Sequence, residues 1–542
     1  MITFDTQPAH YQHWRLSSKG AVARLALDVA EEGGLDEGYR LKLNSYDLGV
    51  DIELADALNR IRFEHPEVRV VIFESGKERV FCAGANIGML ARASHPAKVD
   101  FCRFTNETRG GIEDSSRKSG LKFIAAIKGA CAGGGYELAL CCDEILMVDD
   151  RSTTISLPEV PLLGVLPGTG GLTRLTEKRR VRRDLADLFC TTAEGVRAPR
   201  AKDWGLVDFA AAPGEFDALV AARARALAEG SDRPSGEDGV ALPPLARRIG
   251  EGGYRYSHLK VAIAREKRAA TLLFAGPEES RLAENIDGIL KAGALWWPLA
   301  VARELDDALL LLRANEPEIG TLLLKTEGSL PAVLHCEEII ERHRGHWFVR
   351  EVIGFLRRAL QRLEVTPKTL FALIDKGSCF AGTLFELALA ADRSYMLGGR
   401  EGARIALGPR NFGGLELLNG ATRLKSRFRA LAPDAGLSPL CGTPLEAEEA
   451  LAKGLVTLAP DELDWEEEIR LAIEERASLS PDALSGLEAN LRFAGAESLE
   501  TKVFGRLSAW QNWIFARPNA TGEKGALKSY GGGRPSFDWR RA

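Results

Sequence analysis

The sequence predicts an α/β fold in which a mainly parallel sheet is flanked by helices. Three observations predict it: apolar strand-like runs, their alternation with helical segments, and an internal repeat. The runs VRVVIFES (68–75) and FIAAIKG (123–129) have the length and composition of buried strands. Helical periodicity alternates with them, as in DIELADALNRIRF (51–63) and YELALCCD (136–143). Such alternation is typical of parallel sheets with helical crossovers.

The internal repeat has a period of about 250 residues, so the fold is expected twice. Four anchors recur in the same order and at nearly the same offset, which indicates a tandem duplication. They are HWRLSSKGAVARLAL (13–27) with LKVAIAREKRAATLL (259–273), ELADALNRIRF from Glu53 with ELDDALLLLRA from Glu304, the glycine loops around Gly129 and Gly377, and WGLV at Gly205 with KGLV at Gly454.

The repeat and the composition divide the chain into four segments. Residues 1–230 are the first copy and residues 257–464 the second. Between them, residues 231–256 are expected to be a linker, because SDRPSGEDGVALPP (231–244) is polar and rich in glycine and proline. Residues 465–542 are expected to form a C-terminal helical region and tail.

Composition excludes several classes of protein. With 71 basic and 76 acidic residues among 542, the net charge is −5, which leaves no basic footprint for nucleic acid. The longest helix-like apolar stretch (292–302) is too short to span a bilayer, and the N-terminus lacks a signal-peptide pattern. The spacing of Cys336, His343 and His346 matches no familiar zinc site. We therefore expect a cytoplasmic protein with no membrane, nucleic-acid or metal partner.

Two loops rich in glycine and alanine follow predicted strands of the first copy. They are VFCAGANIGML (80–90) and KGACAGGGYELAL (128–140). Small residues at a strand end let a ligand approach the backbone, and the helix that follows directs free N–H groups there. Side by side, these loops could aim two backbone donors at one oxygen, as an oxyanion hole does.

Two glutamates accompany these loops. Glu137 lies three residues after Gly134, and Glu159 lies in LPEVPLLGVLPGTGG (157–171). A carboxylate pair beside two donors suits general acid–base catalysis or the activation of water. The alternative is a helix N-terminal carboxylate together with a solvated loop glutamate, and spacing alone favours this alternative.

The motifs FCAGANIGML, GACAGGGYELALCCD and LPEVPLLGVLPGTGGLTRL, in this order and followed by WGLVD, resemble the crotonase (enoyl-CoA hydratase/isomerase) superfamily over nearly all of residues 13–210. The resemblance implies a ββα superhelix and an acyl-CoA substrate. Residue by residue, it implies that Ala85 and Gly134 are the oxyanion donors. It also implies that Glu137 and Glu159 are the acid–base pair.

The resemblance further implies residues that contact the substrate. Arg79 falls where family members often carry a basic residue near the coenzyme A phosphates, and Ala83 lies where the adenine end packs. Asn86 departs from the Asp that the family commonly has after the Gly-Ala pair, which affects what is expected of the acyl pocket. Cys102 and Asn106 lie on the segment that often lines this pocket, with packing in the core as the alternative role.

The second copy lacks this chemistry. Its glycine loop reads CFAGTLFEL (379–387), with Thr383 in place of a glycine. Arg410 stands at the position of Glu159, and Pro331 has no N–H to donate. The full expectation is therefore two tandem crotonase-like domains, the second degenerate and structural, followed by C-terminal helices.

A catalytic copy fused to a degenerate one, with ARPNATGEKGALKSYGGGRPSFD (516–538) at the C-terminus, resembles one branch of the superfamily. That resemblance implies hydrolytic ring opening and carbon–carbon cleavage of 2,3-epoxybenzoyl-CoA with two waters. The products would be 3,4-dehydroadipyl-CoA semialdehyde and formate, in aerobic CoA-dependent benzoate degradation. It implies no cofactor, since coenzyme A is part of the substrate, and a homodimer, since the second copy could occupy subunit contacts. The alternatives are an enoyl-CoA hydratase with a fused inactive domain and a non-catalytic acyl-CoA-binding protein.

Overall fold

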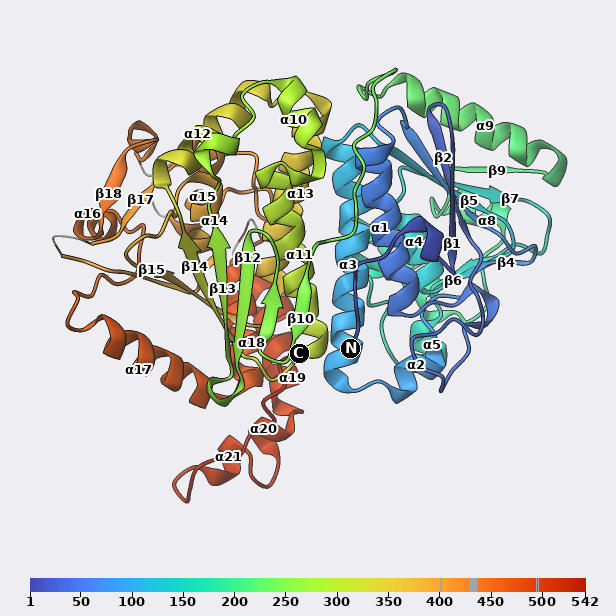
Figure 1. Cartoon of the computed structure of the whole chain (residues 1–542). Coiled ribbons are helices and arrows are strands. Elements are labelled where there is room, and N and C mark those ends of the chain that lie inside the picture. Colours follow the sequence, from blue (N-terminus) through green and yellow to red (C-terminus); the bar gives the residue numbers. More distant parts are fainter. Residues whose placement is uncertain (400–401, 429–435, 494, 496) are drawn as a thin grey trace. The chain divides into compact units, whose positions relative to one another are not determined.

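The computed structural model describes residues 1–399, 402–428, 436–493, 495 and 497–542. The chain divides into two compact units (Figure 1). The first unit is Asp5–Pro244, and the second unit is Met1–Phe4 together with Leu245–Ala542. The first residues belong to the second unit because Ile2 and Asn315 exchange hydrogen bonds of 2.7 and 2.9 Å.

The first unit is built on a six-stranded sheet. Its strand order is β1-β2-β3-β5-β7-β9, with an antiparallel β1–β2 hairpin and parallel neighbours thereafter. A small parallel sheet of order β4-β6-β8 leads into the glycine loops. The strands are β1 (Trp14–Lys19), β2 (Val22–Leu27), β3 (Val70–Ser75), β4 (Val80–Cys82), β5 (Lys122–Ile127), β6 (Ala130–Ala132), β7 (Glu144–Val148), β8 (Ile155–Ser156) and β9 (Phe209–Ala211).

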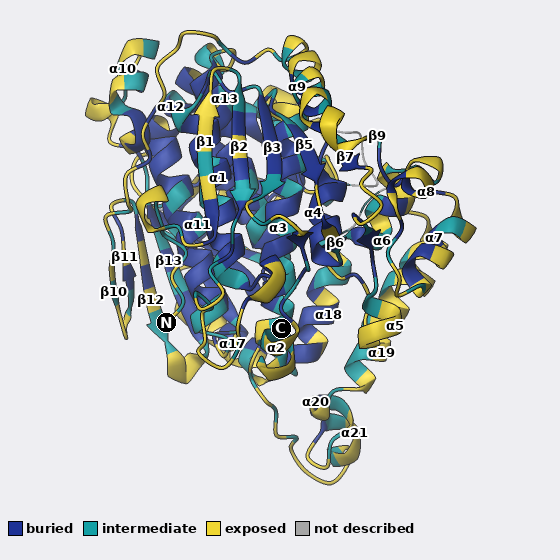
Figure 2. Cartoon of the chain, turned by 90° about the vertical axis from the view of Figure 1, so that its right-hand side faces the viewer, coloured by how far each residue is buried: buried dark blue, intermediate teal, exposed yellow. Residues whose placement is uncertain are grey.

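Helices cover both faces of the six-stranded sheet (Figures 1 and 2). The helices of the first unit are α1 (Leu48–Glu64), α2 (Ile87–Arg92), α3 (His95–Lys118), α4 (Gly134–Cys141), α5 (Glu159–Leu163), α6 (Gly171–Thr173), α7 (Arg183–Thr191), α8 (Ala198–Asp203) and α9 (Pro213–Glu229). In β3, Val71 and Phe73 belong to the core that includes α1 and α4, whereas Val70 and Ile72 pack with Phe216 of α9. Burial on both faces explains why the strand runs are continuously apolar.

Local caps fix where the helices of the site begin. Asp47 accepts the N–H groups of Gly49 (2.9 Å) and Val50 (3.3 Å) and so starts α1. Ser94 accepts from Ala97 (3.4 Å) at the start of α3. These caps place the segment before α1 and the long α3 on either side of the glycine loops.

The second unit repeats this topology, which confirms the α/β fold class. The hairpin of β12 and β13 is antiparallel, and β13, β14, β15 and β16 follow in parallel order, as β1 to β7 do. Within the described residues its strands are β10 (Arg248–Gly250), β11 (Gly253–Arg255), β12 (Leu259–Ala264), β13 (Ala269–Ala275), β14 (Thr321–Glu327), β15 (Thr369–Ile374), β16 (Arg393–Met396), β17 (Arg404–Ala406) and β18 (Pro444–Glu446).

The C-terminal helices belong to the second unit. Ala472 and Ile473 of α17 pack on Phe371 and Tyr395 of its sheet, while α20 and α21 project from the rest of the unit (Figure 1). The helices of the described part are α10 (Ile286–Ala292), α11 (Trp297–Asn315), α12 (Leu330–His343), α13 (Trp347–Val365), α14 (Gly382–Ala390), α15 (Arg423–Arg427), α16 (Ala447–Ala452), α17 (Trp465–Ser478), α18 (Pro481–Arg492), α19 (Ser508–Phe515), α20 (Pro518–Thr521) and α21 (Ala526–Ser529).

Part of the span 231–256, which composition predicts as a linker, is instead sheet. Its last residues form β10 and β11, and Tyr254 pairs with Val261 of β12. A sheet edge leaves a row of unpaired backbone groups, and this hairpin satisfies those of β12. The charged residues and glycines of β10 and β11 do not form the apolar pattern by which strands are predicted from sequence. Among the described residues, no helix is both long and apolar enough to cross a membrane.

Candidate functional site

The two glycine loops of the first unit pack against each other. A Cβ added to Gly84 (φ +86°) would lie 2.8 Å from the nitrogen of Gly134, so only a glycine permits this approach. Tyr46 fixes the first loop, because its N–H donates to Gly84 O (3.0 Å) and its carbonyl accepts from Asn86 (2.8 Å). The N–H groups of Ala85 and Gly134, the predicted donors, have no acceptor within the part of the chain that the structure describes. Two free donors therefore lie in adjacent loops.

Glu137 is held rigidly in the first turn of α4. Its side chain is buried, and Oε1 accepts from the N–H groups of Thr169 (3.0 Å) and Gly171 (2.8 Å). The Thr169 hydroxyl donates to Oε2. Gly171 is required here, since a Cβ would lie 2.8 Å from Oε1. Both carboxylate oxygens thus act as acceptors and anchor the loop that follows α5.

Glu159 has a contrasting environment at the start of α5. Its Oε1 would lie 2.7 Å from a Cβ on Gly133, which has φ +54°, so the bare glycine makes room for the carboxylate. Its Oε2 is buried and has no hydrogen-bond partner among the described residues. Burial, and then the negative charge of Glu137, raise the pKa of Glu159 to about 7. The two predicted glutamates are therefore neighbours, one holding three donors of the chain and one able to exchange a proton near neutral pH.

Replacing Glu159 with glutamine is expected to stabilise the chain at pH 8 but not at pH 5. With a folded-state pKa near 7 against an ordinary 4.5, the native state holds a proton that the unfolded chain has released. The free energy of unfolding therefore falls as the pH rises from 4.5 through about 7, and above pH 7 the full cost of the buried charge is present. Glutamine carries no charge and avoids the penalty. Calorimetric melting temperatures of both proteins at the two pH values test this, and an equal difference at both would contradict it.

The acyl-pocket candidates on α3 face the loop that Glu137 anchors. Asn106 Nδ2 donates to Gly168 O (3.1 Å), and Cys102 Sγ would lie 3.9 Å from a Cβ on Gly168. Burial and the charge of Glu137 raise the pKa of the Cys102 thiol to about 11, so it is a protonated thiol at neutral pH. Both residues thus lie in the neighbourhood of the carboxylate pair.

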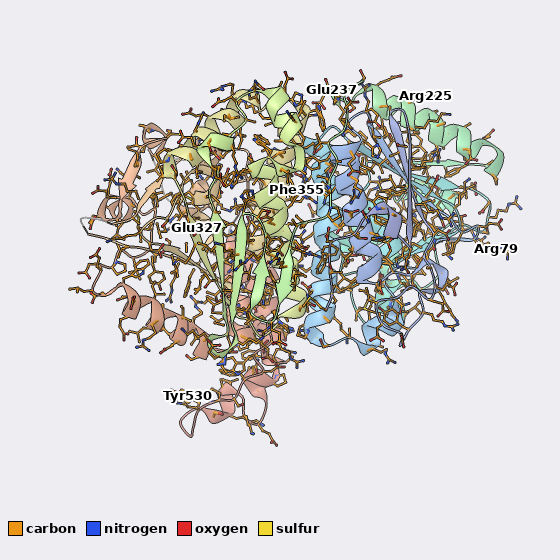
Figure 3. All side chains as sticks on the ribbon, in the orientation of Figure 1. Arg79, Arg225, Glu237, Glu327, Phe355 and Tyr530 are labelled. Carbon is orange, nitrogen blue, oxygen red and sulfur yellow. The ribbon has the colours of Figure 1, made fainter. Side chains whose placement is uncertain are left out.

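The other predicted contacts are more peripheral. Arg79 is exposed and points outward in Figure 3, and Ala83 is half-buried with its N–H bonded to Leu43 O (3.1 Å). Asn86 differs from its expected role, because its amide is used by the protein: Oδ1 caps α2 at Met89 N (2.9 Å), and Nδ2 donates to Arg40 O (2.8 Å) and to a serine hydroxyl (3.0 Å). We interpret Asn86 as a residue that shapes the first loop.

Sequence reasoning missed three features of the site. Thr169 holds Glu137, and its signal was present as a third glycine-rich motif, PGTGG (167–171). A buried ion pair of Asp51 and Arg109 (2.8 Å) lies beneath the site, and its only signal was a charge at an apolar helical position. Tyr46 lies beside Gly134, with a Cβ on that glycine placed 2.0 Å from Oη.

The corresponding region of the second unit is closed by its own side chains. Thr383 N–H, at the start of α14, donates to Glu337 Oε1 (3.1 Å), and a Cβ on Gly382 would lie 2.5 Å from Glu337 Cγ. Glu386, the counterpart of Glu137, is paired with Arg423 (2.7 Å). Arg410 is paired with a glutamate of α12. An internal carboxylate thus occupies the helix start that is free in the first unit.

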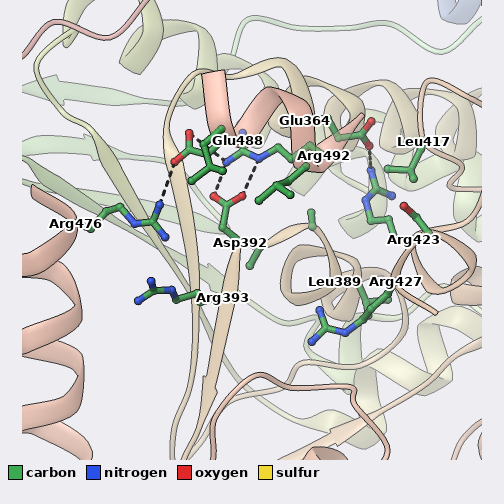
Figure 4. Close-up of a pocket in the computed structure, with 15 residues that line it drawn as sticks. Glu364, Leu389, Asp392, Arg393, Leu417, Arg423, Arg427, Arg476, Glu488 and Arg492 are labelled. Atoms are coloured by element: carbon green, nitrogen blue, oxygen red, sulfur yellow. Dashed lines mark hydrogen bonds and ion pairs between the residues drawn. The ribbon is translucent and has the colours of Figure 1, made fainter. Parts of the chain in front are cut away.

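The second unit also contains a cavity of about 440 Å³, shown in Figure 4. None of the predicted site residues line it. Its lining includes the ion pairs of Arg492 with Asp392 (2.5 Å) and Arg423 with Glu364 (2.6 Å). The first pair joins α18 to the residues after α14, and the second joins α15 to α13, so the cavity is lined by ion pairs that hold packed helices together.

Comparison with known proteins adds four findings. Residues 39–234 match the profile of the enoyl-CoA hydratase/isomerase family. Over its full length the chain is 56% identical to benzoyl-CoA-dihydrodiol lyase of Aromatoleum evansii, covering 98% of that protein. Over 28% of the chain it is 34% identical to the fatty acid oxidation complex subunit alpha of Aliivibrio fischeri, of which it covers 20%. Among solved structures, an enoyl-CoA hydratase from Geobacillus kaustophilus is 34% identical over 40% of this chain and 75% of that one, with a TM-score of 0.35.

Proposed function

Because this chain belongs to the benzoyl-CoA-dihydrodiol lyase family of the crotonase superfamily, and is thus a lyase acting on coenzyme A thioesters, we propose that it opens the ring of 2,3-epoxybenzoyl-CoA. The reaction consumes two waters and gives 3,4-dehydroadipyl-CoA semialdehyde and formate. The observation that carries the proposal is the carboxylate pair beside two free backbone donors. Glu159, with a pKa of about 7, can take and return protons at neutral pH.

The proposed roles follow from the two environments. Glu159 takes a proton from water as the water oxygen bonds to a ring carbon and the epoxide carbon–oxygen bond breaks, and it returns that proton to the released epoxide oxygen. Glu137, fixed by Thr169 and Gly171, orients the second water. Its negative charge also contributes to the raised pKa of Glu159. Glu159 thus exchanges protons while its neighbour Glu137 accepts hydrogen bonds.

The backbone donors act when the carbon–carbon bond breaks. Its electron pair moves toward the thioester, and the N–H groups of Ala85 and Gly134 stabilise the enolate oxygen. Loss of one such donor typically costs about 3–4 kcal/mol of transition-state stabilisation. The two waters and the epoxide supply the three oxygens of the aldehyde and the formate, and the bonds are redistributed within the substrate, so the reaction as proposed uses no redox cofactor and no metal.

Binding of the rest of the substrate is proposed from the family pattern. Arg79, exposed and free to pair with phosphate, suits the polar end of coenzyme A. Cys102 and Asn106 are proposed to contact the acyl group. We also propose a cytoplasmic homodimer. Large exposed apolar side chains along the C-terminal segment, among them Phe504, Phe515 and Tyr530, support a second copy as their partner. Figure 3 shows Tyr530 at the far end of this segment.

The purified chain is expected to release one formate per 2,3-epoxybenzoyl-CoA consumed and to hydrate crotonyl-CoA negligibly. Enzymatically generated epoxide, formate quantification and crotonyl-CoA hydration assayed in parallel make this test. Rapid hydration without formate would identify an enoyl-CoA hydratase with an inactive second unit. Binding of both thioesters with no turnover would identify an acyl-CoA-binding protein.

A further inference from the structure

Tyr46 is a buried residue that the proposed mechanism does not use. Its side chain is 3% exposed. The ring is held by Phe101, with centroids 5.8 Å apart, and by the Arg109 guanidinium, 5.4 Å from its centroid. Its backbone is bonded to both Gly84 and Asn86 of the first glycine loop. The position of its hydroxyl is therefore fixed relative to the predicted donors.

The Tyr46 hydroxyl lacks a hydrogen-bond partner among the residues that the structure describes. It points at the start of α4, where a Cβ on Gly134 would lie 2.0 Å from Oη. Buried hydroxyls are nearly always hydrogen-bonded, because an unpaired donor in a low-dielectric environment is costly. Burial also raises the pKa of Tyr46 well above its ordinary value, so the hydroxyl keeps its proton.

The charged groups near Tyr46 are occupied with other partners. Arg109 donates to Asp51 Oδ1 (2.8 Å), and the other oxygen of Asp51 accepts from the Thr105 hydroxyl. The carboxylate of Glu137 accepts three hydrogen bonds from the loop after α5. The missing acceptor is therefore not a neighbouring side chain, and the open direction is toward the free N–H at the start of α4.

We propose that Tyr46 Oη donates a hydrogen bond to the thioester oxygen of the bound acyl group, as a third donor beside Ala85 and Gly134. A helix N-terminus favours an oxygen that carries negative charge, and the hydroxyl points at that same place. The proposal rests on the proposed function for its ligand, a coenzyme A thioester, but not on the ring-opening reaction.

Replacing Tyr46 with phenylalanine tests the proposal, because it removes the hydroxyl and keeps the ring. We expect the dissociation constant for benzoyl-CoA, measured calorimetrically, to rise about fivefold to tenfold. S-benzyl-CoA, a thioether without the carbonyl oxygen, is expected to bind the two proteins equally. We expect kcat/KM for the epoxide substrate to fall about tenfold to a hundredfold.

The melting temperature separates a binding role of the Tyr46 hydroxyl from a structural role, because a structural hydroxyl would lower the melting temperature when it is removed. The unliganded phenylalanine variant is expected to melt at the same temperature as the wild type or higher, since an unpaired buried hydroxyl is removed. Tyr136→Phe is the matched control: that hydroxyl donates to Leu206 O (2.7 Å), so its loss is expected to lower the melting temperature.

Equal effects of Tyr46→Phe on both ligands, or no effect on either, would overturn the proposal. If the wild type released no formate while the difference between the two ligands held, the ring-opening reaction would be wrong and the role of Tyr46 would stand.

Discussion

Replacing Glu159 with glutamine is expected to lower kcat/KM for the coenzyme A thioester by about 10²- to 10⁴-fold, the range that loss of a positioned general acid or base produces. Glutamine keeps the size of the side chain but cannot take up a proton. Because Glu159 Oε2 has no protein partner among the described residues, the exchange breaks no hydrogen bond that this oxygen makes within the chain. Activity should therefore fall without a loss of stability.

The pH profile separates catalysis from structure. Wild-type kcat/KM is expected to rise with pH through about 7, as Glu159 loses its proton and becomes a base. The variant should lack this inflection. Glu229→Gln, the same chemical change at an exposed position at the end of α9, is the control and should keep both the rate and the profile. A Glu159 variant with the wild-type rate would remove that residue from the mechanism.

Replacing Asp51 with asparagine is expected to destabilise the first unit by about 3–5 kcal/mol, the usual cost of removing one partner from a buried ion pair. Asp51 and Arg109 have side chains that are 3% and 1% exposed, and their atoms are 2.8 Å apart. Without the carboxylate, the guanidinium remains buried with its charge uncompensated. Urea titration and calorimetry of the first unit's transition measure the loss.

The exposed ion pair of Lys128 and Asp217 is the control, because its N–O distance is nearly equal to that of Asp51 and Arg109. These atoms are 2.7 Å apart, but the side chains are 51% and 84% exposed. Asp217→Asn should therefore change stability by no more than about 1 kcal/mol. Equal losses in the two variants would show that burial does not govern the cost.

Much of the fold could be predicted because it follows from local pattern. Apolar runs, helical periodicity and the repeat are properties of adjacent residues, and they gave the alternation of strands and helices in both units. The glycine loops and Glu137 were found because the chemistry of a close backbone approach restricts residue type at each step. The β10–β11 hairpin could not be found, since its reason for forming is the unpaired edge of β12.

Residues whose roles depend on distant contacts also escaped prediction. Thr169 matters because its N–H and hydroxyl meet a carboxylate 32 residues earlier in the chain. Asn86 bonds through its side-chain amide to Arg40 O and to the N–H of Met89 in α2, contacts that its place in the motif did not reveal. Tyr46 precedes Gly134 by 88 residues in the sequence (134 − 46). Such pairings are set by packing, which no single-segment pattern encodes.

The carboxylate of Glu337 in the second unit has a thermodynamic consequence. It is covalently part of the chain, so the start of α14 carries its acceptor oxygen at a fixed effective concentration that no dissolved thioester can match. The N–H at the start of α4 has no such acceptor within the described chain and takes one from a thioester that binds. A ligand at about 100 times its dissociation constant raises the free energy of unfolding of the unit that binds it by about 2.7 kcal/mol. Coenzyme A thioesters should therefore separate the two units in stability, strengthening one and leaving the other as it is without ligand.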